Sequence, residues 1–426
     1  MSIPRRLNFA VSAAILTLAL APAAATGPEA ARFWPQWRGP LGTGEAPHAT
    51  PPLEWSAAKN VAWKVPVPGI GKSTPVVWDG LIVLTTAVPA SAGPDPELAF
   101  TVLAYDRASG ALRWQRVVRT ARPHEGHHRD GTFASPSAIL DGERIYAFFG
   151  SRGLYALDLT GTVLWEKDLG DLQTRMSFGE GASAALYDGT LVVTWDHEGE
   201  DFVAAFDAAT GREKWRQSRD EPTTWATPHI LTHAGRAQVV VNGTNRLVAY
   251  DLGSGEVIWQ TAGTTLNVIP SPVSADGMVY ATAGFRGSSL KAIRLEHAKG
   301  DLTGPPAVAF TYDRDTPYVP SPLVYRGGLY FLKSNSGILT QLDAKTGAVR
   351  YTQRLEAVPN VYASPVGAAG RVYIVGREGT TLVLEAGPEY KVLATNALDE
   401  PIDASPALVD GEIYLRSTKH LYRIAE

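Results

Sequence analysis

The chain has 426 residues, of which 45% are hydrophobic, and its formal net charge is −4 with acidic and basic residues mixed along the chain. It contains no cysteine, which excludes disulfide bonds, a thiolate nucleophile, a cysteine zinc site, covalent c-type haem and a lipid-modified N-terminal cysteine. Since nucleic-acid binding usually requires a basic patch, this charge balance gives no support to a nucleic-acid partner.

Residues 1–25 are predicted to be a signal peptide. The pair Arg5-Arg6 precedes an apolar run at 9–20, and Ala23-Ala24-Ala25 supplies small residues suited to a cleavage site. The run is shorter than the ~20 residues that a membrane span needs, so we expect no span in the mature chain. We therefore expect a periplasmic or secreted protein. The arginine pair leaves both the general secretory and the twin-arginine route open.

A repeated phrase begins after a Pro-rich segment at 26–60, which we expect to form an N-terminal arm packed across the domain. The phrase is Ser or Thr followed by Pro, an apolar strand, a Gly turn and a second apolar strand, as in Ser321–Leu332. Its proline position recurs at 75, 136, 184, 228, 272, 322, 365 and 406, with Ala184 in place of proline in the third copy. Most of these intervals lie in the forties, the length of one four-stranded propeller blade.

A second phrase follows the first in phase. It is a strand that ends in Asp, a Gly turn and a strand that carries Trp, as in Ala205–Trp215. Asp accepts hydrogen bonds from the following backbone, Gly allows a positive φ, and Trp offers a flat apolar surface that can wedge between adjacent blades. The fifth and seventh copies are degenerate in this phrase.

The two ends of the chain complement each other. The eighth copy ends at Leu421–Ile424 with no Trp strand after it, and an unused Trp strand stands at Val61–Val65. We therefore predict an all-β fold at 61–426, an eight-bladed β-propeller of four-stranded blades in which the N-terminal strand completes the last blade. Such closure removes exposed sheet edges.

The phrase at Ala205–Trp215 resembles the tryptophan-docking repeat of dehydrogenases that depend on pyrroloquinoline quinone (PQQ). The linked phrases over 61–426 are also similar to the non-enzymatic propeller lipoprotein of the outer-membrane β-barrel assembly machinery. The resemblance implies either a quinoprotein enzyme or a cofactor-free scaffold, because fold alone does not fix function. The adjacent cysteines common in quinoprotein alcohol dehydrogenases are missing, as is the lipoprotein cysteine.

If the strands are lettered A to D from the axis outward, the A–B and C–D turns share one face and are plain tight turns. The B–C turns and D–A connections share the other face, here called the loop face, and almost every blade places polar side chains there. Because loops on a rigid scaffold usually carry binding residues, we expect the ligand at this channel mouth. The candidates are Glu180, Trp225, Asn267, Arg286, Tyr318, Asn360, Tyr362, Arg377 and Asp403.

Two further groups on the loop face have the donor types of a metal site. The spacing of His124, His127 and His128 can present imidazoles together, and Asp196-His197-Glu198 is acidic enough for a hard cation. The alternative for both is a solvated or charged surface loop.

The leading hypothesis is therefore an exported binding or scaffold propeller, a monomer that takes a protein or a small molecule on the loop face, with no haem. The alternative is a small soluble quinoprotein oxidoreductase using PQQ with a divalent cation such as calcium. A hydrolase or lyase acting on sugars has no motif in its favour.

Overall fold

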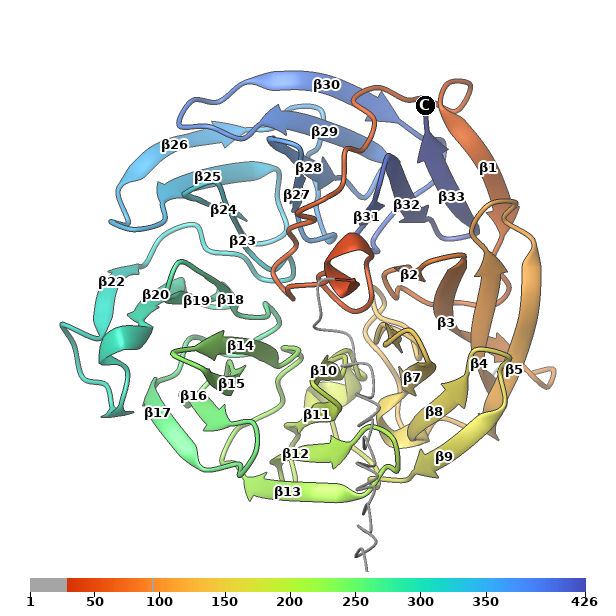
Figure 1. Ribbon diagram of the computed structural model, residues 1–426, viewed down its shortest axis with the longest axis horizontal. Helices are drawn as coiled ribbons and strands as arrows, with labels where there is room; N and C mark the ends of the chain where they lie inside the picture. The colour runs from red at the N-terminus through yellow and green to blue at the C-terminus, as the bar shows by residue number, and fades with distance from the viewer. Residues whose placement is uncertain (1–28, 94–95) are drawn as a thin grey trace, which may run out of the picture.

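A computed structural model describes residues 29–93 and 96–426, and these form eight sheets arranged in a ring (Figure 1). The prediction of an eight-bladed β-propeller is confirmed. The signal peptide predicted at 1–25 lies outside the described residues. Short 3-10 helices occur at η1 (Ala30–Arg32), η2 (Gly150–Arg152), η3 (Arg175–Ser177) and η4 (Leu295–His297).

The first four blades run in chain order, each from its inner to its outer strand. Their strands are β2 (Val76–Trp78), β3 (Leu81–Pro89), β4 (Leu98–Asp106) and β5 (Leu112–Ala121); β6 (Ile139–Leu140), β7 (Arg144–Phe148), β8 (Leu154–Asp158) and β9 (Val163–Lys167); β10 (Ala185–Tyr187), β11 (Thr190–Trp195), β12 (Phe202–Asp207) and β13 (Glu213–Ser218); β14 (His229–His233), β15 (Arg236–Val241), β16 (Arg246–Asp251) and β17 (Val257–Ala262). The short β21 (Gly300–Asp301) adds to the outer edge of the fourth blade, parallel to β17.

The remaining blades continue the ring. Their strands are β18 (Val273–Ala275), β19 (Met278–Ala283), β20 (Ser289–Arg294) and β22 (Val308–Tyr312); β23 (Leu323–Tyr325), β24 (Gly328–Leu332), β25 (Ile338–Asp343) and β26 (Val349–Arg354); β27 (Val366–Ala368), β28 (Arg371–Val375), β29 (Thr380–Glu385) and β30 (Val392–Ala397); β31 (Ala407–Val409), β32 (Glu412–Arg416), β33 (His420–Ala425) and β1 (Val61–Pro66).

The N-terminal strand closes the ring as predicted. β1 pairs antiparallel with β33, with Trp63 opposite Arg423 and Val65 opposite Leu421. The last blade therefore combines strands from both ends of the chain, and β33 has no open edge.

Tryptophans of the outer strands join neighbouring blades. The indole N–H of Trp215 donates to the backbone oxygen of Leu252 in the next blade at 2.8 Å, and its ring lies over Gly255. Trp165 makes the same contacts with Ala208 at 3.0 Å and with Gly211. The predicted wedge is thus a repeated contact between one blade and the Gly turn of the next.

A ring of hydroxyl groups joins the inner strands of all eight blades. The backbone N–H of each member donates to the side-chain oxygen of the member in the next blade, at 2.9 to 3.2 Å. Between the eighth and first blades the hydroxyl of Thr74 instead donates to the backbone oxygen of Ser405 at 3.1 Å. The hydroxyl ring consists of Thr74, Ser137, Ser183, Thr227, Ser271, Ser321, Ser364 and Ser405.

In the second blade, the structure shifts the predicted repeat position by two residues. The alignment placed Ser135-Pro136 at the repeat position, but the ring member is Ser137, which accepts the N–H of Thr74 at 2.9 Å. Ser135 instead bonds locally to Thr132. Blades two and three thus both have alanine, Ala138 and Ala184, after the ring hydroxyl, and the first interval lengthens by two residues.

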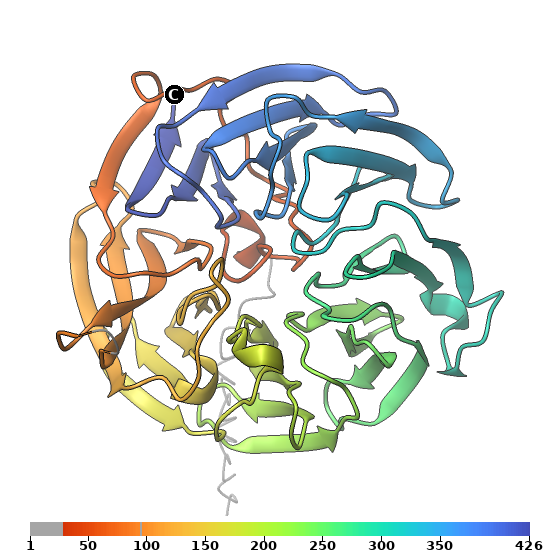
Figure 2. The same ribbon diagram turned by 180° about the vertical axis from the view of Figure 1, so that it is seen from behind.

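The arm crosses the face of the A–B turns, here called the arm face, which Figure 1 shows towards the viewer; Figure 2 shows the loop face. The Trp34 and Val77 backbones exchange both hydrogen bonds, at 2.8 and 3.1 Å, and the Trp34 side chain is fully buried. Further on, Arg38 is buried within the ring and donates to the backbone oxygens of Pro322 and Pro365. The arm therefore fills part of the central channel from this side.

Candidate functional site

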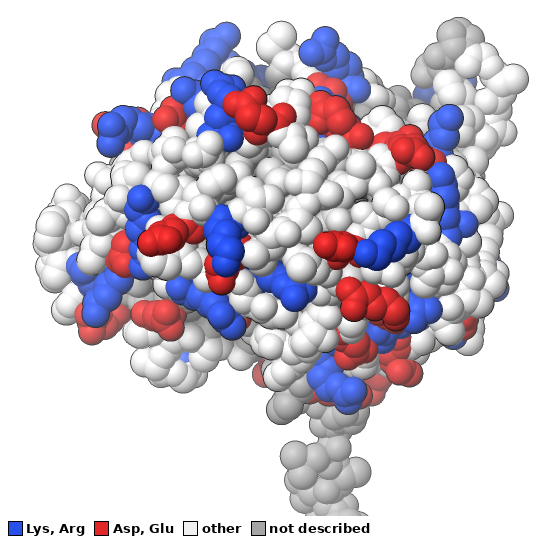
Figure 3. Space-filling view, turned by 90° about the horizontal axis from the view of Figure 1, so that it is seen from above, with Lys and Arg blue, Asp and Glu red and all other residues white. Residues whose placement is uncertain are grey.

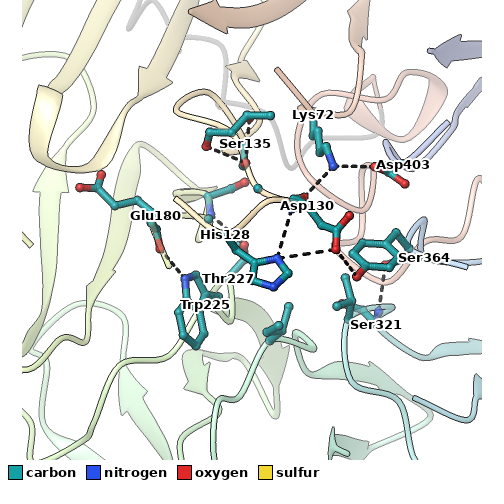
Figure 4. Close-up of a pocket in the computed structure, with 18 of the residues that line it drawn as sticks. Lys72, His128, Asp130, Ser135, Glu180, Trp225, Thr227, Ser321, Ser364 and Asp403 are labelled. Carbon is teal, nitrogen blue, oxygen red and sulfur yellow. Dashed lines mark hydrogen bonds and ion pairs between the residues drawn. The ribbon is translucent and has the colours of Figure 1, made fainter. Parts of the chain in front are cut away.

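A pocket of about 220 Å³ lies on the axis of the ring and opens on the loop face. We call it the central pocket; Figure 4 shows its labelled residues converging from several blades. Its wall contains six members of the hydroxyl ring, namely Ser183, Thr227, Ser271, Ser321, Ser364 and Ser405. A pocket thus lies at the channel mouth of the loop face, where we expect the ligand; that it binds one stays a prediction.

The floor of the central pocket is Trp37 from the arm. Its indole N–H donates to the hydroxyl oxygen of Ser271 at 3.2 Å. Trp37 also lines a second cavity on the arm face. The indole therefore separates two cavities that would otherwise be parts of one channel.

An ion network occupies one side of the pocket. Arg377 donates from Nε to Asp403 at 2.7 Å and from Nη2 to Asp130 at 2.9 Å, and Lys72 Nζ contacts Asp403 at 2.5 Å. Tyr362 lies under the guanidinium, 4.0 Å from it, and donates its hydroxyl to Asp130 at 3.2 Å. We call these residues the rim network. The network has two cations and two carboxylates, and the exposed Arg129 lies 3.6 Å from Asp130 as a further cation.

The rim network favours the ionised form of Asp130. Burial works against the charged form of Asp130, but the hydrogen bond and the charge of Arg377 outweigh it, so the pKa of Asp130 lies below its ordinary value. Each oxygen of Asp130 has a side-chain donor, Arg377 or Tyr362. Both carboxylates of the network are therefore committed to groups of the protein.

Aromatic side chains form much of the remaining wall. Trp225 donates its indole N–H to the Gly179 backbone oxygen at 2.6 Å, and Tyr318 stacks on Phe285 with 4.9 Å between ring centroids. His128 packs edge-on against Phe178. These contacts fix the rings, so the pocket presents apolar faces beside the hydroxyl groups.

Glu180 reaches the edge of the pocket but turns its carboxylate away from the centre (Figure 4). Its oxygens accept the backbone N–H of Ser151 at 2.8 Å and the Ser151 hydroxyl at 2.5 Å. A Cβ on Gly150 would lie 1.5 Å from the Glu180 carboxylate, so only glycine fits there. Burial raises the pKa of Glu180 to about 6.

The structure gathers most of the nine predicted ligand residues at this pocket. Glu180, Trp225, Tyr318, Tyr362 and Asp403 line it, and Arg377 adjoins it through the rim network. The other three are not in its lining: Asn267 is buried and interacts with Tyr318, Arg286 is exposed over Phe285, and Asn360 donates to Glu378. Ligand binding by any of them stays a prediction.

The predicted histidine group does not converge. His124 donates from Nε2 to the Leu172 backbone oxygen at 2.6 Å, and its Nδ1 accepts from Arg152 at 2.9 Å. His127 contacts the backbone oxygen of its neighbour and the ring of Phe133, while His128 lies at the central pocket.

The donor atoms of His124 lie instead within 4.8 Å of those of Glu125 and Glu180. All three side chains already have protein partners: Arg152 on His124, Thr174 on Glu125 and Ser151 on Glu180. A cation at this cluster would have to displace the Arg152 guanidinium.

The acidic group at 196–198 points in different directions. Asp196 is buried and ion-paired with Arg219 at 2.6 Å, and Glu198 accepts from the Thr223 hydroxyl at 2.8 Å. His197 accepts the N–H of Gln173 at 3.0 Å. These contacts tie the B–C turn of the third blade to the connections on either side. A metal at these residues stays a prediction.

Sequence reasoning did not select Trp37, Lys72, Asp130 or the hydroxyl ring. The ring carries a signal, because its members are the Ser or Thr of the repeated phrase. The pairing of Tyr362, Arg377 and Asp403 with Lys72 and Asp130 carries no such signal: Lys72 and Asp403 are 331 positions apart and come together only when the ring closes.

Comparisons with known proteins agree with the fold. The sequence model of the family described as "Outer membrane protein assembly factor BamB" matches residues 54–200 and 199–426. Proteins of that description from Burkholderia pseudomallei (strain K96243) and Yersinia pestis are 27% and 25% identical over 46% and 47% of this chain. The matches span 46% and 62% of those relatives, less than two thirds of either.

Solved structures show the same architecture. BamB from Moraxella catarrhalis has a TM-score of 0.59 at 14% identity, covering 85% of this chain and 99% of that one. A europium-containing methanol dehydrogenase has a TM-score of 0.65 at 11% identity, covering 92% and 90%. The quinohemoprotein alcohol dehydrogenase from Comamonas testosteroni has 0.64 at 14%, covering 93% and 81%. At these identities the likeness concerns the fold alone.

Within residues 29–93 and 96–426, no helix combines the length and the hydropathy needed to cross a membrane.

Proposed function

Since this chain belongs to the family of the outer membrane protein assembly factor BamB, we propose that it is an exported propeller that acts by binding, with its ligand in the central pocket. The leader-like segment at 1–25 supports export to the periplasm or beyond. The aromatic and hydroxyl-lined pocket on the loop face supports the choice of site.

The hydroxyl ring indicates the chemistry of the ligand. Each ring oxygen in the pocket wall accepts a backbone N–H from the preceding blade, so its own proton is left to donate. Several donors therefore face the axis above an indole floor. The ligand they suit is a small molecule with oxygen acceptors and a flat apolar part.

The ligand can be sought directly in protein recovered from its own export compartment. We expect native mass spectrometry to find a bound small molecule on the wild type. The substitution Ile269→Trp fills the pocket without removing a polar partner, because Ile269 lines it with an apolar side chain, and should abolish the adduct. Met176→Trp, at a side chain 77% exposed, is the matched control and should retain it.

An adduct that survives Ile269→Trp would place the ligand elsewhere. If neither form carries an adduct, the scaffold form of the proposal remains to be tested by capture of a protein partner on the loop face. The variants Ile269→Trp and Met176→Trp can be compared in that capture too. A partner that docks on the rim does not need an open pocket, so we expect Ile269→Trp to retain it.

A quinoprotein oxidoreductase is the second candidate, favoured by the indole of Trp37 as a platform for a planar quinone. The pocket does not fit the divalent cation that PQQ would bring. Asp130 and Asp403 are bound by Arg377 and Lys72, and both oxygens of Glu180 are bound by Ser151. A calcium ion prefers several oxygen ligands, and here every nearby carboxylate is already taken.

Thermal unfolding with PQQ, with and without calcium, separates the two candidates. A ligand that binds the native state at a concentration 100 times its Kd adds about 2.7 kcal/mol of stability, which is a readily measured rise in Tm. We expect no rise that depends on calcium. A calcium-dependent rise that is lost in Glu180→Gln would establish the quinoprotein candidate instead.

A further inference from the structure

A second cavity, of about 370 Å³, lies on the arm face beneath Trp37. We call it the lower cavity. It is bounded by the arm at 36–45 and by the inner strands of the third, fourth and fifth blades, β10, β14 and β18. The arm crosses the ring beside β27, β31 and β2 in Figure 1 and leaves β14 clear. Binding in the lower cavity does not depend on the ligand proposed for the central pocket.

The arm binds inner strands at one repeated position, the third residue after the ring hydroxyl. There the Val77 N–H donates to Trp34, the Leu140 N–H to Pro35 and the Leu186 N–H to the side chain of Gln36. In the seventh blade the N–H of Gly367 donates to Gly44. Arm residues 34, 35 and 36 thus each accept one hydrogen bond from the inner strand of a different blade, the first, second and third in turn.

Ile230 and Ser274 occupy the same position in the fourth and fifth blades. Ser274 stands one residue before the pair that closes its hairpin, as Val77 does in the first blade. Ile230 stands three residues before the closing pair of its hairpin, which is the same phase of the antiparallel alternation. The N–H and C=O of both residues therefore point away from the paired strand and towards the axis, as those of Val77 do. Both residues line the lower cavity and are half-buried. Within the described residues, no arm residue accepts a hydrogen bond from either N–H.

Two carboxylates face the same space. Glu45 from the arm and Asp276 from the A–B turn of the fifth blade both line the lower cavity. Burial raises the pKa of Glu45, and the negative charge of Asp276 raises it further, so the two carboxylates repel each other electrostatically. Among the described residues, neither has a cationic partner within 4 Å; Arg326 acts on Glu45 only from a greater distance.

We propose that the lower cavity binds an extended polypeptide segment of a partner, which carries a Lys or Arg side chain. Its backbone would bond to Ile230 and Ser274 as the arm bonds to the first, second, third and seventh blades, and its cation would lie between Glu45 and Asp276. An unpaired strand edge is a template for such an added segment. The charge of the two acids selects a basic over an acidic sequence.

The absence of cysteine allows a direct test by disulfide tethering. Leu41→Cys places one thiol at the rim of the lower cavity, on a side chain 47% exposed. The probes are three blocked peptides: Cys-Gly-Val-Lys-Val, the same peptide with Glu for Lys, and the Lys peptide with N-methylated valines. Mass spectrometry at thiol–disulfide equilibrium gives the fraction of protein carrying each probe.

We expect the Lys peptide to be favoured over both other probes by about tenfold, and the preference to fall to about threefold or less in Glu45→Gln and Asp276→Asn. Met176→Cys, on the loop face, is the control thiol and should show no preference. Equal capture of all three probes at Leu41→Cys would overturn the proposal. So would equal capture of the Lys peptide and its N-methylated form. N-methylation removes the peptide N–H groups that would donate to the carbonyls of Ile230 and Ser274 and blocks close pairing with their strands, whereas attraction by charge alone needs neither.

Discussion

The indole of Trp215 covers Gly255 in the next blade so closely that a Cβ on that glycine would lie 2.7 Å from the ring. Gly255 also has a φ of +76°. Two independent constraints therefore demand glycine at the turn of the repeated phrase, and both can be measured.

Replacing Gly255 with alanine should add two costs. The positive φ costs about 1–2 kcal/mol for a residue with a Cβ, and the clash with Trp215 adds about 1–3 kcal/mol. Gly235 is the matched control, because its φ is +77° and a Cβ there would have nothing within 4 Å. Denaturant unfolding of both variants should show the larger loss for Gly255→Ala; equal losses would mean that Trp215 does not confine the turn.

The register of the second blade predicts that Ser137→Ala lowers the free energy of unfolding more than Ser135→Ala does. Ser137→Ala removes the acceptor of the buried Thr74 N–H and should cost about 1–3 kcal/mol of unfolding free energy. Ser135 makes only local contacts with Thr132, so Ser135→Ala should cost below about 1 kcal/mol. The reverse order would restore the alignment that placed Ser135 in the hydroxyl ring.

Glu180 predicts a pH dependence with a definite sign. Its pKa rises from 4.5 to about 6 on folding, so the folded protein binds more protons than the unfolded one between these values. The stabilisation from the protonated form is complete below the unfolded pKa and is lost as the pH rises through 6, an effect of about 2 kcal/mol.

That effect can be isolated by comparing the wild type with Glu180→Gln. The free energy of unfolding of the wild type, minus that of the variant, should fall by about 2 kcal/mol between about pH 4 and pH 7.5. A difference that stays constant over this range would show that burial does not raise the pKa of Glu180.

The architecture was predictable because its signals are local and repeated. Eight copies of two linked phrases define the blades, and the unmatched strand at Val61–Val65 revealed the closure. The register of the second blade was not predictable, since Ser135 and Ser137 flank the same proline. Only the hydrogen bond from Thr74 distinguishes them.

The location of the central pocket was predictable from the sequence, but the contacts between its residues were not. Tyr362 and Asp403 stand just before inner strands and were selected for that reason. Their partners Lys72 and Asp130 come from the other end of the chain, and Trp37 comes from the arm. No spacing in the sequence encodes a contact that exists only when the first and last blades meet.

The crystal structure of the protein as recovered from its export compartment tests the central claim most directly. We predict electron density for a small molecule in the central pocket of the wild type, lying against Trp37 and within hydrogen-bonding distance of Ser321 and Ser364. Crystals of Ile269→Trp should lack it. Ordered water alone in the wild-type pocket, or a metal ion held by Glu180 after release from Ser151, would contradict the account.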